Sequence, residues 1–179
     1  MKEHILLSLV GPDRTGLVDK ISGAILKQKG NLEDSRMAVL GGEFAMLMLV
    51  SIPGDARQAL EQAVRQEAET LGLLLTIKTT TPRRNENVAT PLKLRVEGMD
   101  HEGIVHDVVH YLAEQGVSVE TLDSQLTNAP HTGSPLFSMN LHLEVPSAVS
   151  LSVLEKGLDA VADRLNVTLE IEQVPRAVV

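Results

Sequence analysis

The sequence predicts an α+β protein made of two ferredoxin-like sandwiches in tandem, each an antiparallel four-stranded sheet with two helices on one face. Hydrophobic residues alternate with period two in the expected strands and recur at i, i+3 and i+4 in the expected helices. These segments follow the order βαββαβ, and the order occurs twice. A polar, proline-flanked stretch, TTTPRRNENVATP, separates the two copies.

The first copy can be followed element by element. An apolar run predicts a strand over 5–10, the Gly11-Pro12 turn ends it, and helical spacing predicts a helix over 15–29. Two alternating segments, 32–40 and 44–52, flank Gly41-Gly42, which is typical of a hairpin. A second helix over 55–71 and a strand over 73–79 complete the copy.

The second copy repeats this order. We expect strands over 92–97, 117–126, 136–145 and 167–174, with helices over 102–115 and 150–165. GPDRTG in the first copy aligns with GMDHEG in the second at an offset of 87 residues. At the same offset, Val18, Ile21 and Ile25 align with Val105, Val108 and Leu112. We therefore expect a first domain over 1–81, a linker over 82–91 and a second domain over 92–179.

Composition excludes several classes of function. The 179 residues include no cysteine, which rules out disulfides, thiol catalysis and cysteine-bound metals. Two Phe and one Tyr are too few to stack nucleic acid bases. Residues 1–81 carry nine basic and ten acidic side chains, a net charge of −1. Residues 82–91 carry two basic and one acidic side chain, a net charge of +1. Residues 92–179 carry five basic and thirteen acidic side chains, a net charge of −8. Such an acidic second half argues against direct nucleic acid binding.

The expected location is the cytoplasm. No apolar run is long enough to cross a membrane, and the start of the chain does not resemble a signal peptide.

The strands of the two copies differ on one face. In the second copy, polar residues alternate cleanly with apolar ones, as expected when one side of a sheet is wet. In the first copy, the segment FAMLMLV is apolar on both faces, and Leu6, Val10 and Leu74 occupy positions where polar residues are expected. A partner chain, a second copy of the protein or a docked target would cover such a face, and a homodimer is the expectation. A merely apolar central strand is the alternative.

The stretch GPDRTGLV, at the end of the first strand, is a candidate ligand loop. It lacks the Gly-Lys-Ser/Thr ending of a phosphate-binding loop and the GxGxxG of a dinucleotide fold. Asp13 is a candidate N-cap, and Gly16 permits close approach to the backbone. A helix N-terminus beside a carboxylate suits a zwitterion such as a free amino acid. A capped helix without a ligand is the alternative.

This loop, together with GNLED at the start of the second strand, resembles the ACT domain, a regulatory module that typically binds amino acids. The segment NLEDSRMAVLGGEFAMLMLVSIP and the tandem arrangement resemble ACT-domain transcriptional repressors. The resemblance covers nearly the whole chain. It implies a non-enzymatic regulator that binds a small amino acid such as glycine and acts through protein contact with a DNA-binding transcription factor. The alternatives are an interaction module that binds no ligand and a free-standing regulatory subunit of an amino-acid metabolic enzyme.

In ligand-binding members of the family, the ligand lies where two units meet. The site uses the loop between the first strand and the first helix of one unit, and the start of the second strand. Carried over, the first-unit site residues are Gly11, Asp13, Arg14, Thr15, Gly16 and Asn31. The second-unit positions are Asp100, His101, Glu102, Gly103 and Ser118. The second unit departs from the pattern, because Glu102 replaces Thr15 and would repel a ligand carboxylate. The second unit is therefore expected to be a structural partner that completes a ligand site formed mainly by the first unit.

His106 and His110 are four residues apart, a spacing that can bind zinc. They lie at the edge of the expected buried face of their helix, and no cysteine completes a site. We therefore expect no metal and no cofactor. No nucleophile elbow is present, and an enzyme is not expected. The loop TNAPHTGSP is a lid, a partner contact or an ordinary surface loop. Arg83-Arg84 is either a docking site for an acidic partner or a solvated part of the linker.

Overall fold

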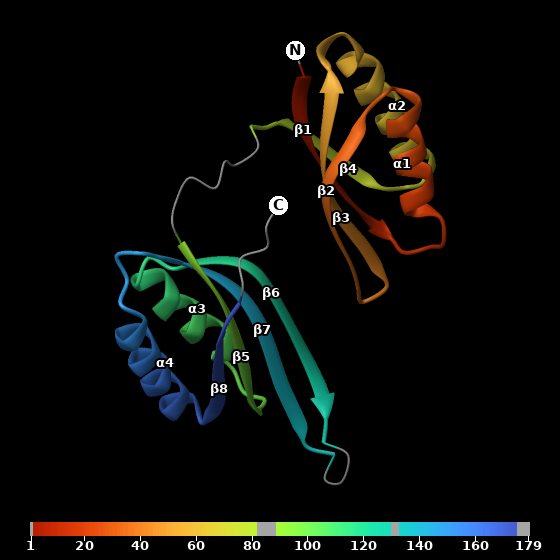
Figure 1. Cartoon of the computed structure of the whole chain (residues 1–179). Helices are drawn as coiled ribbons and strands as arrows, with labels where there is room; N and C mark the ends of the chain where they lie inside the picture. Colours follow the sequence, from red (N-terminus) through yellow and green to blue (C-terminus); the bar gives the residue numbers. More distant parts are fainter. Residues whose placement is uncertain (1, 82–88, 130–132, 175–179) are drawn as a thin grey trace. The chain divides into compact units, whose positions relative to one another are not determined.

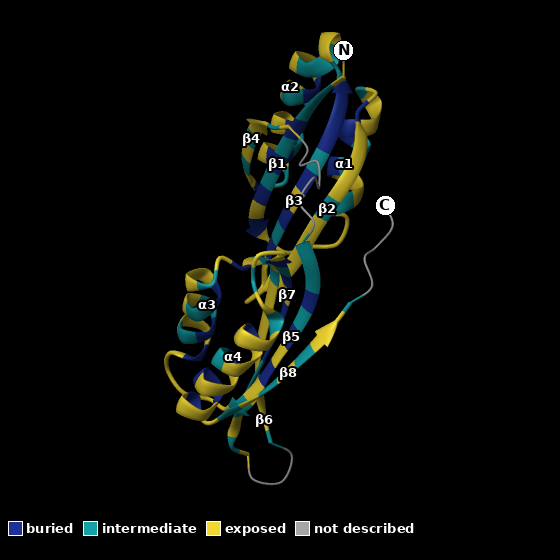
Figure 2. Cartoon of the chain, turned by 60° about the vertical axis from the view of Figure 1, so that its left-hand side comes forward, coloured by how far each residue is buried: buried dark blue, intermediate teal, exposed yellow. Residues whose placement is uncertain are grey.

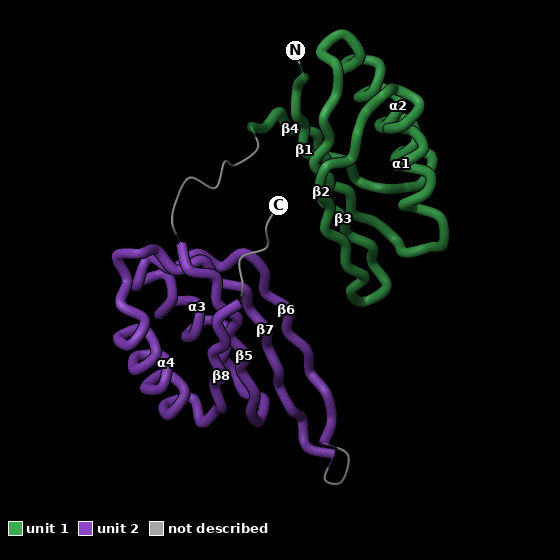
Figure 3. The backbone as a smooth tube through the Cα atoms, in the orientation of Figure 1, with its two compact units in different colours: residues 1–84 green, residues 85–179 purple. Residues whose placement is uncertain are grey.

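The computed structural model describes residues 2–81, 89–129 and 133–174. The chain divides into two compact units, unit 1 over Met1–Arg84 and unit 2 over Asn85–Val179 (Figure 3). Residues 82–88 of the predicted linker, with Arg83-Arg84, lie outside the described residues, as do residues 130–132 of the TNAPHTGSP loop. Among the described helices, none combines the length and the apolar character needed to span a membrane.

Unit 1 is a sheet of order β2-β3-β1-β4 with both long helices on one face (Figure 1). Its elements are β1 (Lys2–Pro12), α1 (Leu17–Lys27), β2 (Asn31–Leu40), β3 (Glu43–Pro53), a short 3₁₀ turn η1 (Gly54–Ala56), α2 (Arg57–Thr70) and β4 (Leu74–Thr79). Every strand pair is antiparallel. The predicted fold class is confirmed for this unit.

Unit 2 repeats the arrangement with the order β6-β7-β5-β8. Its elements are β5 (Ala89–Met99), α3 (Ile104–Glu114), β6 (Ser118–Asn128), β7 (Pro135–Pro146), α4 (Leu151–Leu165) and β8 (Val167–Gln173). Because β5 begins at Ala89, the last three residues of the predicted linker form the start of this strand. The tandem ferredoxin-like architecture is therefore confirmed in both units.

Each unit has its own core between its sheet and its helices. In unit 1, Ile5, Leu7 and Leu9 of β1 and Met48 of β3 are fully buried against α1 and α2 (Figure 2). In unit 2, Leu94 and Val96 of β5 and Leu141 of β7 have the same role. The period-two pattern of these strands follows from burial on one face only.

The sheet faces away from the helices differ between the units. In unit 1, apolar side chains on this face are not covered by other parts of the unit: Leu47 is 46% exposed and Leu74 is 78% exposed. In unit 2, the matching face carries polar side chains, among them Arg95, Glu97 and His142. The expectation that the first face is covered stays a prediction.

Candidate ligand-binding site

The β1–α1 loop of unit 1 is held in place by tight backbone packing. A Cβ on Gly11 would lie 2.9 Å from the carbonyl oxygen of Gly72 and 2.9 Å from Cδ2 of Leu73. Only glycine allows this approach between the end of β1 and the turn after α2. The Asp13 amide then donates to the Gly42 carbonyl at 2.9 Å, which ties the loop to the β2–β3 hairpin.

The helix start differs from the prediction. α1 begins at Leu17 rather than Thr15, and its N-cap is Gly16, with a left-handed φ of 93°. The predicted N-cap role of Asp13 is wrong, because no side chain caps this helix. Asp13 and Thr15 instead lie exposed in the loop.

Arg14 contacts another helix of its own unit. Its guanidinium Nη2 donates to the carbonyl of Leu71, the residue that follows the last turn of α2. A cation at a helix C-terminus is favourable, since the free carbonyls there carry partial negative charge. Arg14 therefore has a structural partner, independent of any ligand.

Asn31 lies far from this loop within unit 1. It opens β2 and pairs with Ser51 of β3, which in turn pairs with His4 near the start of β1. The loop follows the other end of β1, and the eight steps from His4 to Pro12 span about 26 Å at 3.3 Å per residue. One unit therefore cannot bring Asn31 and the β1–α1 loop to one small ligand.

Asn31 lines a pocket of about 340 Å³ between α1 and the start of β2. The polar lining residues are Asp19, Ser22 and Asn31, and the others are Gly23, Ile25, Leu26, Gly30 and Leu32. Gly23 leaves open space, since a Cβ there would meet no atom within 4 Å. Asp19 has a carboxylate and Asn31 a carboxamide, groups that can bind an ammonium and a carboxylate. The Ser22 hydroxyl donates to the Asp19 backbone carbonyl at 3.1 Å.

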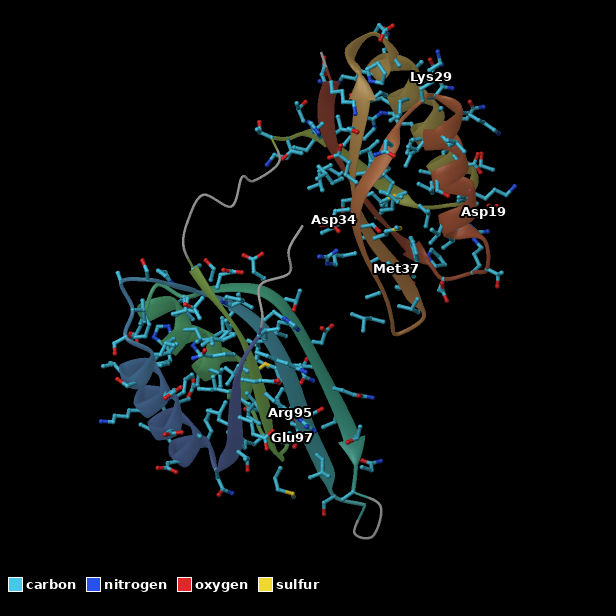
Figure 4. All side chains as sticks on the ribbon, viewed as in Figure 1. Asp19, Lys29, Asp34, Met37, Arg95 and Glu97 are labelled. Atoms are coloured by element: carbon cyan, nitrogen blue, oxygen red, sulfur yellow. The ribbon has the colours of Figure 1, made fainter. Side chains whose placement is uncertain are left out.

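Asp19 and Ser22 were missed from the sequence. In Figure 4 Asp19 projects from α1, away from the sheet that carries Asp34. A signal existed, because Asp19, Ser22 and Gly23 have the i, i+3, i+4 spacing of one helix face. The glycine inside the helix also indicated a special role, since glycine there costs about 1 kcal/mol relative to alanine.

The first loop of unit 2 repeats that of unit 1 with different chemistry. Gly103 is the left-handed N-cap of α3 (φ 97°), and the Asp100 amide donates to Pro135 at 3.1 Å. His101 occupies the position of Arg14, and its Nε2 lies 2.7 Å from the carbonyl oxygen of Leu165, at the end of α4. The carbonyl of Glu102 lies 2.9 Å from its Nδ1. Hydrogen bonds to two backbone carbonyls raise the pKa of His101. The bond to Glu102 has the larger effect, and the bond to Leu165 comes second.

The surface of unit 2 that corresponds to the pocket carries two histidines. At the offset of 87 residues, His106 stands at the position of Asp19 and His110 at that of Gly23. Their rings stack with centroids 5.6 Å apart, and His110 lies 3.4 Å from Glu114. Ser118, the counterpart of Asn31, opens β6. Within the described residues, no group of three or more His, Cys, Asp or Glu side chains is placed to hold a metal ion.

The fold and these loops define an ACT-domain protein. Residues 3–78 match the ACT domain family. A UPF0237 protein of Methanopyrus kandleri is 34% identical over 64 residues, which are 32% of this chain and 71% of that protein. The chain belongs to the ACT-domain family, with two such folds in tandem.

More specifically, the chain is similar to the glycine cleavage system transcriptional repressor of Escherichia coli K12. The two are 23% identical over 165 residues, which are 92% of this chain and 87% of that repressor. A crystal structure assigned to a repressor of the same name shares the fold, with a TM-score of 0.72, 23% identity, and coverage of 98% and 99% of the two chains. An unknown protein from Galdieria sulphuraria matches with a TM-score of 0.85, 29% identity, and coverage of 98% and 100%.

Proposed function

We propose that this chain is a non-enzymatic regulatory protein that binds a small amino acid and thereby changes its contact with a protein partner. The similarity to the glycine cleavage repressor supports glycine as the ligand and a transcriptional regulator of glycine cleavage as the partner. The single observation that carries the proposal is the α1–β2 pocket of unit 1. Its polar lining suits both charged groups of a zwitterion.

The proposed roles follow from the chemistry of the lining. The Asp19 carboxylate accepts from the ligand ammonium, and the Asn31 carboxamide donates to the ligand carboxylate. The β1–α1 loop of the same unit lies at the other end of β1 from Asn31, so it is not part of this pocket. The ligand then acts by linkage, since it favours the conformation that binds it and so changes the affinity for the partner.

Thermal shift against the twenty amino acids tests this function first. A ligand present at 100 times its dissociation constant adds about 2.7 kcal/mol to the free energy of unfolding. We expect glycine or another small amino acid to raise the melting temperature by several degrees. The same amino acid should change association with a transcriptional regulator of glycine cleavage.

Substitutions in the pocket test the residues. We expect Asn31→Ala and Asp19→Asn each to weaken amino acid binding about 10-fold. Asn31→Ala removes a hydrogen bond to the ligand carboxylate, and Asp19→Asn removes the negative charge that attracts the ligand ammonium. Calorimetric titration measures the affinity. The matched control is Glu69→Gln, at an exposed carboxylate of α2 outside this pocket, which should leave the affinity unchanged. Wild-type affinity in both pocket variants would refute the site.

A further inference from the structure

The sheet face of unit 1 that points away from α1 and α2 is called here the outer face. Residues paired across antiparallel strands point to the same side, so the register arranges this face in rows. In the order β4, β1, β3, β2, three full rows are Lys78-Leu6-Leu49-Asp34, Thr76-Ser8-Leu47-Arg36 and Leu74-Val10-Ala45-Ala38. A shorter row, Pro12-Glu43-Leu40, follows.

Apolar side chains occupy the middle of the outer face, and charges lie mainly at its rim. Val10 is 41% exposed and Leu47 is 46% exposed, although both belong to the two central strands. The fold itself does not require this, because the central strands of unit 2 carry Arg95 and Glu97 on the matching face, paired at 2.6 Å (Figure 4). An apolar central area of this kind marks a contact surface.

The charges in these rows sum to zero. Lys78 and Arg36 supply two positive charges, and Asp34 and Glu43 supply two negative charges. The whole chain, by contrast, carries −8. Two copies of such a chain repel each other least where both surfaces are neutral, so this face is suited to contact between like molecules.

We propose that the outer face of unit 1 packs against the same face of a second copy, about a twofold axis parallel to the strands. This rotation lays each row over the same row of the second copy, with the order of the strands reversed. Leu6 of one copy meets Leu49 of the other, and Lys78 of one copy meets Asp34 of the other. The first row is thus complementary to itself in charge, and each row meets its own copy, as a twofold contact requires.

The choice of axis follows from Lys78. An axis across the strands would lay β4 on β4, whose outward-facing residues Leu74, Thr76 and Lys78 include no acid. It would also lay β2 on β2, where Asp34 and Arg36 already form an ion pair within one unit. The axis along the strands instead places Lys78 opposite a carboxylate twice. With either axis the strands of the two sheets stay nearly aligned, as is common for packed sheets.

The mass of the full-length protein in solution tests this contact, by sedimentation equilibrium and light scattering. Wild type is expected at twice the 19.4 kDa of one chain. Leu47→Asp and Leu74→Asp alter exposed positions and are expected to give folded chains of 19.4 kDa, with circular dichroism confirming the fold. The matched control is Asn140→Asp, at the register position of Leu47 in unit 2, which should remain a dimer.

Charge reversal tests the axis. Lys78→Glu and Asp34→Lys should each weaken the dimer roughly 10-fold, because each breaks two symmetric contacts, and the double variant should recover the wild-type constant. A monomeric wild type, a dimer that survives both leucine substitutions, or a double variant weaker than either single one would overturn the proposal. A monomer whose Leu47→Asp variant melts at lower temperature would show that another part of the same chain covers the face, which also overturns it.

Discussion

At the scale of single residues, one position shows how two chemistries serve the same contact. Arg14 and His101 both reach from the first loop of their unit to the carbonyl that ends its second helix, Leu71 in unit 1 and Leu165 in unit 2. The guanidinium is always charged, whereas the imidazole titrates near neutral pH. A neutral imidazole has only one N–H, so it cannot donate to both Glu102 and Leu165 carbonyls.

This difference predicts a pH dependence in unit 2. The pKa of His101 is raised in the folded state, so its contribution to stability is complete below the unfolded pKa and is lost as pH rises through the folded pKa. The nearby acidic side chains of Asp100 and Asp107 act in the same direction. NMR titration of the histidine rings should give His101 a pKa above the ordinary value of about 6.5.

His101→Arg is the matched variant, because it installs the side chain found in unit 1. Its urea unfolding should lose the part of the pH dependence that comes from this position. A His101 pKa at or below the ordinary value, or an unchanged pH profile in His101→Arg, would contradict the assignment.

At the scale of elements, the two helices of unit 2 depend on a glycine for their contact. Gly157 lies inside α4, and a Cβ there would collide with the hydroxyl and ring of Tyr111 on α3. Gly157→Ala should therefore destabilise unit 2 by about 1–3 kcal/mol through overpacking, although alanine is the better helix former. Urea unfolding measures the change.

Gly23→Ala is the control for this substitution. Gly23 also lies inside a helix, but a Cβ there meets nothing within 4 Å. It should stabilise unit 1 by up to about 1 kcal/mol. Equal effects of the two substitutions would show that helix propensity, and not the contact with Tyr111, decides the outcome.

The elements also show what the sequence could predict. The order of strands and helices was readable because burial on one face imposes a period of two or 3.6. The start of α1 was predicted two residues too early, since the sequence does not reveal that Gly16 is left-handed. The contact between Arg14 and Leu71 joins residues 57 positions apart, and no local pattern encodes it. The pocket role of Asp19 likewise required the packing of α1 against β2.

At the scale of the whole molecule, the two units are separate cores on one chain. Unit 1 has 84 residues and unit 2 has 95, sizes at which a single domain can fold alone. We expect fragments 1–81 and 89–174 each to unfold cooperatively by circular dichroism. The first fragment should self-associate through its outer face, and the second should not. A fragment without a cooperative transition would mean that its unit needs the other to fold.

The irregularity in β2 between Leu32 and Asp34 recurs in β6 between Val119 and Thr121. Both strands lie at a sheet edge, where free N–H and C=O groups invite a foreign strand. An extra residue bends the edge and breaks the even spacing of these groups. Neither edge therefore offers an uninterrupted template along its full length. The same one-residue insertion occurs in both units, and at these two edges it opposes the addition of a further strand from another chain.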